Sequence, residues 1–260
     1  MKITSLTNPH IKHVVKLRNR KDRDGYGQTI VEGHREITRA LEAGISIMEL
    51  YFTADGKSET RGIVQKMIKK ETTVYETTKE VFSKISYGDH EEGVLAVVEP
   101  KSVELNRYQK VNPLFVVIEG VEKPGNLGAI LRTCDGAGVD GVIICDTKTD
   151  IYNPNVIRAS LGTVFTNKVL VASNEDTLEF LRSNKIKVCA TRVQAETLYT
   201  KENLTGALAI VVGSEQDGLS SFWADNAQLQ VKIPMKGKAD SLNVSASAAI
   251  LLYEAVRQRG

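Results

Sequence analysis

Short apolar runs rich in branched residues alternate along this chain with longer stretches in which apolar residues recur at helical spacing. This pattern predicts strands alternating with helices, and therefore an α/β layer structure. In the first half we expect strands at 29–32, 47–53, 73–75 and 93–98, and helices starting at Asn8-Pro9 and at 34–43, 59–70 and 79–85. The charged, glycine-containing stretch 19–27 is expected to be a loop.

The second half alternates more clearly. We expect strands at 114–118, 141–145, 168–171, 188–191, 208–212 and 230–233, and helices at 127–136 and from Ser241 onward. These strands are continuously apolar, as in a parallel sheet buried on both faces. The polar stretch between Pro100 and Pro113 predicts a linker at 100–112, with an N-terminal α/β domain at 1–99 and a parallel-sheet domain at 113–260.

The composition, with 42% hydrophobic and 25% charged residues, is typical of a soluble globular protein. The longest apolar runs have about six residues, too few to span a bilayer, and the N-terminus lacks the apolar core of a signal peptide. We therefore expect a cytoplasmic protein without a membrane partner. Three widely spaced cysteines and the absence of CxxC predict no structural metal. His10 and His13 have metal-ligand spacing, but an exposed helix face is the favoured interpretation.

The net charge of +2 is unevenly distributed. Residues 1–23 hold seven basic side chains against one acidic, a net charge of +6, whereas residues 24–99 have a net charge of −5. A basic arm followed by an acidic body indicates contact with a polyanion such as nucleic acid. The alternative is a solvated helix face, and charge alone leaves the two about equal.

Three strand-to-helix junctions, at 118–128, 209–219 and 231–245, carry glycine beside polar residues. Ligands bind beyond the carboxyl ends of the strands in an open parallel sheet, so these junctions predict one shared site. In the first, Gly120 and Gly125 have the spacing of a phosphate loop, but Asn126-Leu127 replaces Lys-Ser/Thr, and GxGxxG is absent. Nucleoside triphosphate and ordinary dinucleotide binding are therefore disfavoured. All four histidines precede residue 100, so a catalytic second domain would work without histidine.

The segments NLGAILRTCDGAG, VVGSEQDGLS and IPMKGKADSLNVSASAAILLYE resemble, in order and spacing, the three motifs of the SpoU/TrmH branch of the SPOUT RNA methyltransferases. The resemblance covers residues 111–260, and the first half loosely resembles the substrate-binding domain of rRNA-modifying members. It implies a trefoil knot in the second domain, S-adenosylmethionine as methyl donor, and a homodimer formed through helices of the knotted domain. The implied reaction is methyl transfer to a ribose 2′-hydroxyl.

The resemblance also implies individual roles. The cofactor-binding positions are Gly213, Ile233 and Leu242, and the catalytic positions are Asn126, Arg132, Glu215, Ser241 and Asn243. Arginine is normally fully protonated, so we expect Arg132 to grip the target phosphate and polarise the hydroxyl rather than act as a base. Asn126 and Asn243 would orient groups by hydrogen bonds, and Glu215 would hold Arg132 or its own loop. Because Arg132 follows Asn126 by six residues, we expect both near the same helix face.

RNA capture is expected to fall to the arm, where four cations surround Tyr26: Arg18, Arg20, Lys21 and Arg23. The rRNA-type first half favours 23S rRNA over tRNA, and DNA is not expected. Two alternatives stay open, a tRNA ribose methyltransferase and a non-catalytic RNA-binding protein with the same fold. A nicotinamide-dependent oxidoreductase is disfavoured by the missing GxGxxG.

Overall fold

The structure is a computed structural model that describes residues 1–70, 72–87, 92–101 and 110–260. The chain divides into two compact units, Met1–Lys101 with Asp150–Thr166, and Ser102–Thr149 with Asn167–Gly260. The α/β class with a parallel sheet is confirmed. In the part of the chain that is described, no helix has both the length and the apolar composition needed to cross a bilayer.

The first unit departs from the expected division at 1–99 because it includes the segment Asp150–Thr166. The contacts that hold this segment include a buried ion pair between Arg23 and Asp150 (2.7 Å), a hydrogen bond from Thr29 Oγ1 to Tyr152 O (2.7 Å) and one from Arg39 Nη1 to Leu161 O (2.5 Å). Such pairings of distant residues leave no local pattern in the sequence. Residues 102–109 of the expected linker lie outside the described residues.

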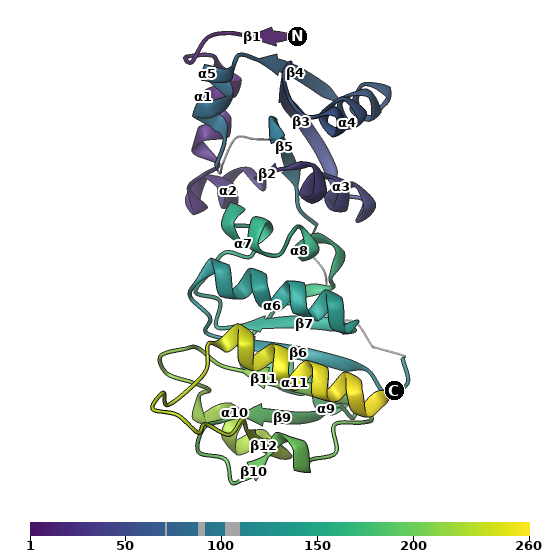
Figure 1. The fold of residues 1–260 in the computed structure, drawn as a ribbon, viewed down its shortest axis with the longest axis vertical. Helices are drawn as coiled ribbons and strands as arrows, with labels where there is room; N and C mark the ends of the chain where they lie inside the picture. The colour runs from purple at the N-terminus through teal and green to yellow at the C-terminus, as the bar shows by residue number, and fades with distance from the viewer. Residues whose placement is uncertain (71, 88–91, 102–109) are drawn as a thin grey trace. The chain divides into compact units, whose positions relative to one another are not determined.

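The first unit is built on a mixed five-stranded sheet of order β1-β4-β3-β5-β2, in which β5 runs antiparallel to both neighbours. Its strands are β1 (Lys2–Ile3), β2 (Thr29–Glu32), β3 (Ser46–Thr53), β4 (Thr73–Thr77) and β5 (Val94–Glu99). Its helices are α1 (Pro9–Lys16), α2 (Arg20–Tyr26), α3 (His34–Glu42), α4 (Ser58–Lys69), α5 (Lys79–Ile85), α7 (Pro154–Ala159) and α8 (Thr163–Thr166). Within this unit, α1 and α5 cover one face of the sheet and α3 and α4 the other (Figure 1).

The expected loop at 19–27 is wrong, because residues 20–26 form helix α2. The helix ends at Gly27, whose φ of 65° is the left-handed conformation that glycine adopts readily. Arg23 is only 4% exposed, and its Nη1 donates to the carbonyls of Leu17 and Arg18. Composition alone does not show which arginine in a run of charged residues is buried. The charged, glycine-containing sequence therefore led to the expectation of a loop.

The second unit contains a seven-stranded, entirely parallel sheet of order β10-β12-β9-β11-β6-β7-β8. Its strands are β6 (Leu114–Glu119), β7 (Gly141–Cys145), β8 (Val169–Val171), β9 (Lys187–Thr191), β10 (Thr197–Leu198), β11 (Leu208–Val212) and β12 (Leu229–Lys232). Its helices are α6 (Pro124–Ala137), α9 (Asn174–Ser183), α10 (Ser221–Asn226), α11 (Val244–Arg259) and the short 3₁₀ helix η2 (Tyr199–Lys201).

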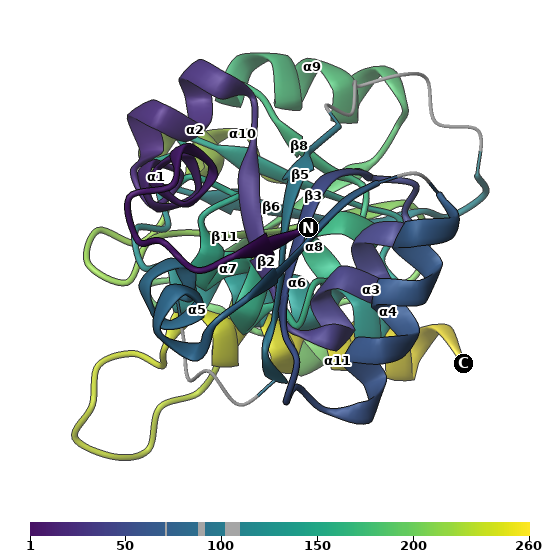
Figure 2. The ribbon, with the colours of Figure 1, turned by 90° about the horizontal axis from the view of Figure 1, so that it is seen from above.

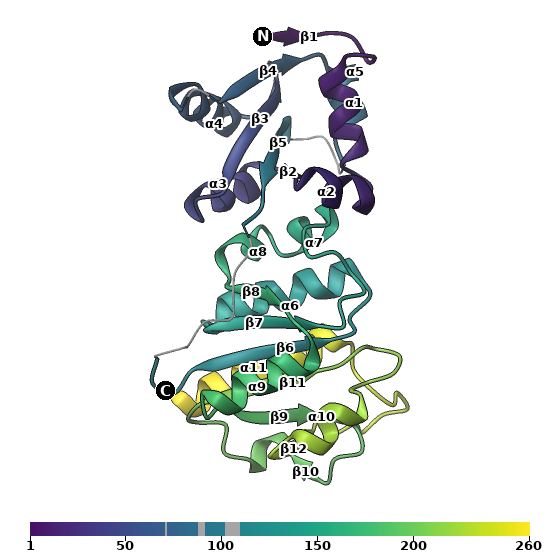
Figure 3. The same ribbon diagram turned by 180° about the vertical axis from the view of Figure 1, so that it is seen from behind.

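Helices cover both faces of this sheet. Figure 1 shows α6 and α11 together on one face, and Figure 3 shows α9 and α10 on the other. The three strands β6, β7 and β11 are buried at every residue, which explains their continuous apolar sequences. Because all seven strands are parallel, the loops that follow them emerge at one edge of the sheet. The longest of these, between β12 and α11, extends away from the helices in Figure 2.

Candidate active site

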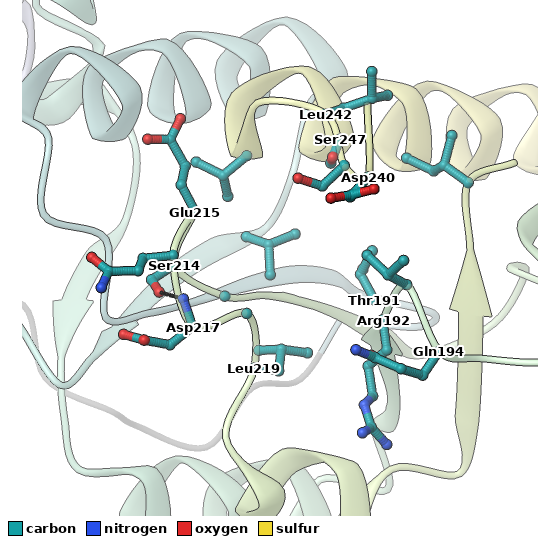
Figure 4. A pocket seen from close by; sticks show the side chains of 18 of the residues that line it. Thr191, Arg192, Gln194, Ser214, Glu215, Asp217, Leu219, Asp240, Leu242 and Ser247 are labelled. Carbon is teal, nitrogen blue, oxygen red and sulfur yellow. Dashed lines mark hydrogen bonds between the residues drawn. The ribbon is translucent and has the colours of Figure 1, made fainter. Parts of the chain in front are cut away.

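A cavity of about 430 Å³ lies at the carboxyl edge of the parallel sheet. Loops after β9, β11 and β12 and the first turn of α11 line it, and Figure 4 shows their side chains around the cavity. The three expected cofactor-binding positions, Gly213, Ile233 and Leu242, all line it, as does Ser241. The structure therefore brings the second and third junctions together at one cavity.

Gly213 lies at the end of β11, where the chain makes a tight turn. A Cβ at this position would overlap the carbonyl of Gly218. Ser214 and Gly218 exchange two backbone hydrogen bonds, both 3.1 Å, which close the turn after β11. The glycine thus allows the turn after β11 to form, and this turn provides one wall of the cavity.

The carboxyl end of β9 and the loop that follows it also line the cavity, although the sequence motifs did not predict this. This segment contributes residues 191–194, including Thr191 and Arg192. The Thr191 hydroxyl is buried and, within the described chain, has no hydrogen-bond partner. The end of the expected strand at 188–191 was a possible signal, but only the strand order, with β9 between β11 and β12, places it at the site.

Three of the expected catalytic residues form one hydrogen-bonded cluster beside the cavity. Asn126 Nδ2 donates to Glu215 Oε1 at 2.7 Å, and Asn243 Nδ2 donates to Asn126 Oδ1 at 3.2 Å and also to Glu215 Oε1. The Oδ1 atom of Asn243 accepts from the backbone N–H and the hydroxyl of Ser245, so this residue also caps α11. Residues from all three junctions therefore hold one another in fixed orientations.

The second carboxylate oxygen of Glu215 faces Lys123, whose Nζ lies 2.8 Å from Oε2. This lysine holds the pKa of Glu215 below its usual range, and the carboxylate in turn raises the pKa of Lys123. Glu215 is therefore ionised at neutral pH. A second cavity of about 310 Å³ adjoins this pair and is lined by residues 121–123, Asn126 and 214–216.

Arg132 does not join this cluster. Six residues of α-helix rotate a side chain by about 600°, which leaves Arg132 about 120° around α6 from Asn126, so the expected shared face is wrong. The side chain is exposed and lines neither of the two cavities described above. Among the described residues no ion pair joins Arg132 to Glu215, which instead binds Lys123 and the two asparagines.

The basic arm is only partly available to a ligand. Arg23 is buried against Asp150, and the Arg18 guanidinium donates to the carbonyls of Lys84 and Ser86. Both arginines therefore stabilise the fold and are removed from the expected set of phosphate contacts. Arg20 and Lys21 are exposed.

An exposed aromatic ring accompanies these two cations. Tyr26 is 50% exposed, and its ring packs edge-on against His13. His13 also contacts Gln28, and His10 contacts Glu49, so the two histidines have separate partners. No group of metal-ligating side chains occurs among the residues described.

Comparison with known proteins identifies the family. A model of the SpoU rRNA methylase family matches residues 113–253, and a model of the MRM3-like substrate-binding domain matches residues 8–96. The chain belongs to the SpoU rRNA methylase family. It is an S-adenosylmethionine-dependent RNA methyltransferase.

Relatives of the family resemble the chain over its whole length. The 23S rRNA guanosine 2′-O-methyltransferase RlmP of Bacillus subtilis is 28% identical over 251 residues, covering 96% of this chain and 97% of RlmP. A solved RNA 2′-O ribose methyltransferase is 41% identical with a TM-score of 0.88, covering 99% of both chains. The AdoMet-bound rRNA methyltransferase of Sinorhizobium meliloti is 30% identical with a TM-score of 0.91, covering 99% of this chain and 97% of its own.

The cavity fits the family's cofactor. Its volume lies within the usual range of small-molecule sites. Ile233, Leu219 and Leu242 provide apolar surface for an adenine ring, and the partnerless Thr191 hydroxyl is a polar group that a bound ligand would satisfy. The residues present therefore suit a nucleoside with both an apolar face and hydrogen-bonding edges.

Proposed function

We propose that this methyltransferase modifies a ribose 2′-hydroxyl in 23S rRNA. The observation that carries the proposal is the cluster of Asn126, Glu215 and Asn243 beside the cofactor cavity. Further support comes from RlmP, which is named for this reaction and matches the chain over nearly its whole length.

In the proposed site, Gly213, Ile233 and Leu242 hold the cofactor, with Thr191 as an additional hydrogen-bonding residue. When bound, S-adenosylmethionine supplies an electrophilic methyl group. The turn closed by Gly213 shapes the cavity wall, and the apolar side chains exclude water from the adenine faces. Ser241, which is exposed at the cavity, would bind the reacting nucleotide or the cofactor's polar end.

The cluster would orient the target ribose, and the 2′-hydroxyl proton released as the methyl group is transferred would pass to bulk water, because Glu215 and Asn243 are exposed. Glu215 is ionised and accepts from both asparagines, so their amide groups are fixed before substrate arrives. Holding two bound substrates in a reactive orientation can lower the reaction barrier by about 7–11 kcal/mol, and the fixed amide groups would contribute to that orientation. From its exposed position on α6, Arg132 is proposed to bind the phosphate adjacent to the target ribose. Its planar guanidinium can donate two parallel hydrogen bonds to that phosphate.

The proposed function also assigns a role to each domain of the chain. Residues 1–99 would serve as the RNA substrate-binding domain and 113–260 as the SPOUT domain, which would act as a homodimer in the cytoplasm. A trefoil knot is proposed from the family resemblance, and the return of α11 from β12 to pack on α6 and β11 is compatible with such a path. The exposed Tyr253 on α11 provides apolar surface for a second copy.

The test is transfer of labelled methyl groups from S-adenosylmethionine to purified, unmodified 23S rRNA and, separately, to tRNA. We expect label in 23S rRNA, at a position that resists alkaline cleavage because its 2′-oxygen is methylated. Label only in tRNA would overturn the substrate assignment. Tight RNA binding without transfer to either RNA would identify a non-catalytic RNA-binding protein.

A further inference from the structure

Lys123 is the one charged partner of Glu215 among the described residues, and it is not one of the proposed catalytic residues. It is the N-cap residue of α6, immediately before Pro124. Its backbone carbonyl accepts hydrogen bonds from the backbone N–H groups of Asn126 (3.0 Å) and Leu127. The backbone of Lys123 and the side chain of Asn126 are therefore connected through the same helix turn.

The two carboxylate oxygens of Glu215 are divided between different partners. Oε1 accepts from Asn126 and Asn243, whereas Oε2 faces Lys123 Nζ at 2.8 Å. A carboxylate bound on one oxygen only could rotate about its terminal bond and release the asparagines. With Lys123 on the second oxygen, rotation would break contacts on both sides.

We propose that Lys123 is a positioning residue that holds the Glu215 carboxylate in the orientation required by Asn126 and Asn243. The inference rests on the proposed function for its effect on methyl transfer. The lysine would act through Glu215 without contacting the reacting atoms. Its removal should leave the cofactor cavity unchanged, because Lys123 does not line it.

Other charged groups lie near Glu215, so the specific effect of Lys123 can be distinguished from the effect of removing any positive charge in this region. Glu122 lies next to Lys123 and pairs with Lys148 at 2.9 Å, while Asp217 follows on the turn of Glu215 and Asp240 lies on the loop before α11. Lys148 therefore provides a matched control. It is an exposed lysine in an ion pair with a glutamate of the same region, but it does not contact Glu215.

The sign of the pH effect follows from the direction of the pKa shift. Lys123 lowers the pKa of Glu215, so the carboxylate stays charged as the pH falls toward the acidic range. Replacing Lys123 by glutamine should raise that pKa and move the acid limb of the pH profile of kcat upward by about one pH unit. An opposite charge nearby typically shifts a carboxyl pKa by about 1–3 units, and the low end applies here because the pair is exposed. At pH 7.5, where Glu215 remains ionised, kcat should fall only about two- to fivefold through looser orientation.

The experiment compares Lys123→Gln, Lys123→Arg and Lys148→Gln in the full chain. Methyl transfer is measured between about pH 3.5 and 8 at saturating cofactor and RNA, so that the window includes the usual pKa range of a glutamate. We expect the acid limb to shift in Lys123→Gln and to return in Lys123→Arg, with KM for S-adenosylmethionine unchanged in all three. An unshifted limb in Lys123→Gln, or an equal shift in Lys148→Gln, would overturn the proposal.

A second measurement does not depend on catalysis. The carboxyl carbon of Glu215 can be titrated by NMR in protein carrying ¹³C-labelled glutamate, with its resonance assigned by its absence in Glu215→Gln. We expect an upward shift of the titration midpoint in Lys123→Gln and no shift in Lys148→Gln. If the wild-type protein transferred no methyl group, the proposed function would fail while this titration still decided whether Lys123 controls Glu215. Equal midpoints in wild type and Lys123→Gln would refute that control.

Discussion

The buried hydroxyl of Thr191, which lacks a partner among the described residues, allows a sharp test of the cofactor cavity. Thr191→Val keeps the shape of the side chain and removes only the hydroxyl. Because one net hydrogen bond is worth about 0.5–1.5 kcal/mol, affinity for S-adenosylmethionine should fall about two- to tenfold in calorimetric titration. Thr147 has a similarly partnerless buried hydroxyl outside the cavity lining, so Thr147→Val is the control. Unchanged affinity in Thr191→Val would exclude the proposed contact.

Arg132 is a second residue whose importance is testable by substitution. Its exposed position on α6 implies that Arg132→Ala keeps the fold and the affinity for the cofactor. Loss of an essential catalytic contact normally costs about a hundredfold or more, so single-turnover methyl transfer with saturating cofactor and RNA should fall by at least that factor. Arg132→Lys should restore little, because an ammonium lacks the two-pronged geometry. A rate within about threefold of wild type for Arg132→Ala would rule out the catalytic role.

At the scale of elements, most strands of the parallel-sheet unit were predictable from the sequence, whereas of its described helices α6 and α11 were predicted and α9, α10 and η2 were not. Strands at 141–145 and 208–212 agree with β7 and β11 residue for residue, because continuous apolar runs flanked by glycine leave few alternatives. The short helices α7 and α8 of the first unit were also missed, since their apolar residues pack against α3 and β2, which are distant in sequence. Sequence distance also explains which site residues were predicted. The motifs indicated residues 213, 233 and 242, but only the fold shows that Thr191 and Lys123 lie at the site.

The buried pair of Arg23 and Asp150 connects α2 to the segment before α7 within the first unit. Removing one partner from such a pair leaves an uncompensated buried charge, which typically costs about 3–5 kcal/mol. Arg23→Ala should therefore lower the free energy of unfolding by about that amount in urea titrations. Arg20→Ala is the control, because its ion pair with Asp24 is exposed and 3.6 Å long, and it should have little effect. Equal destabilisation by both variants would show that the buried pair has no special role.

At the scale of the whole molecule, the uneven charge distribution still points to RNA capture by the first unit, with fewer cations than the sequence suggested. Deleting residues 1–23 would be an unsuitable test, because Ile11, Val14 and Leu17 of this segment are fully buried in the core. The exposed cations Arg20 and Lys21 can instead be replaced together by glutamine without disturbing that core.

Each phosphate contact releases counterions, so the slope of log affinity against log salt should become shallower by about 1.4–1.8 when both cations are lost from Arg20→Gln/Lys21→Gln. Binding of 23S rRNA between about 50 and 200 mM salt measures this slope. The double variant Arg61→Gln/Lys66→Gln removes the same charge from exposed positions on α4 of the same unit. If RNA contacts α2 directly, only the first double variant changes the slope, and cofactor affinity stays constant in both. Equal slopes in the two variants would mean that α2 contributes only to the overall charge of the protein.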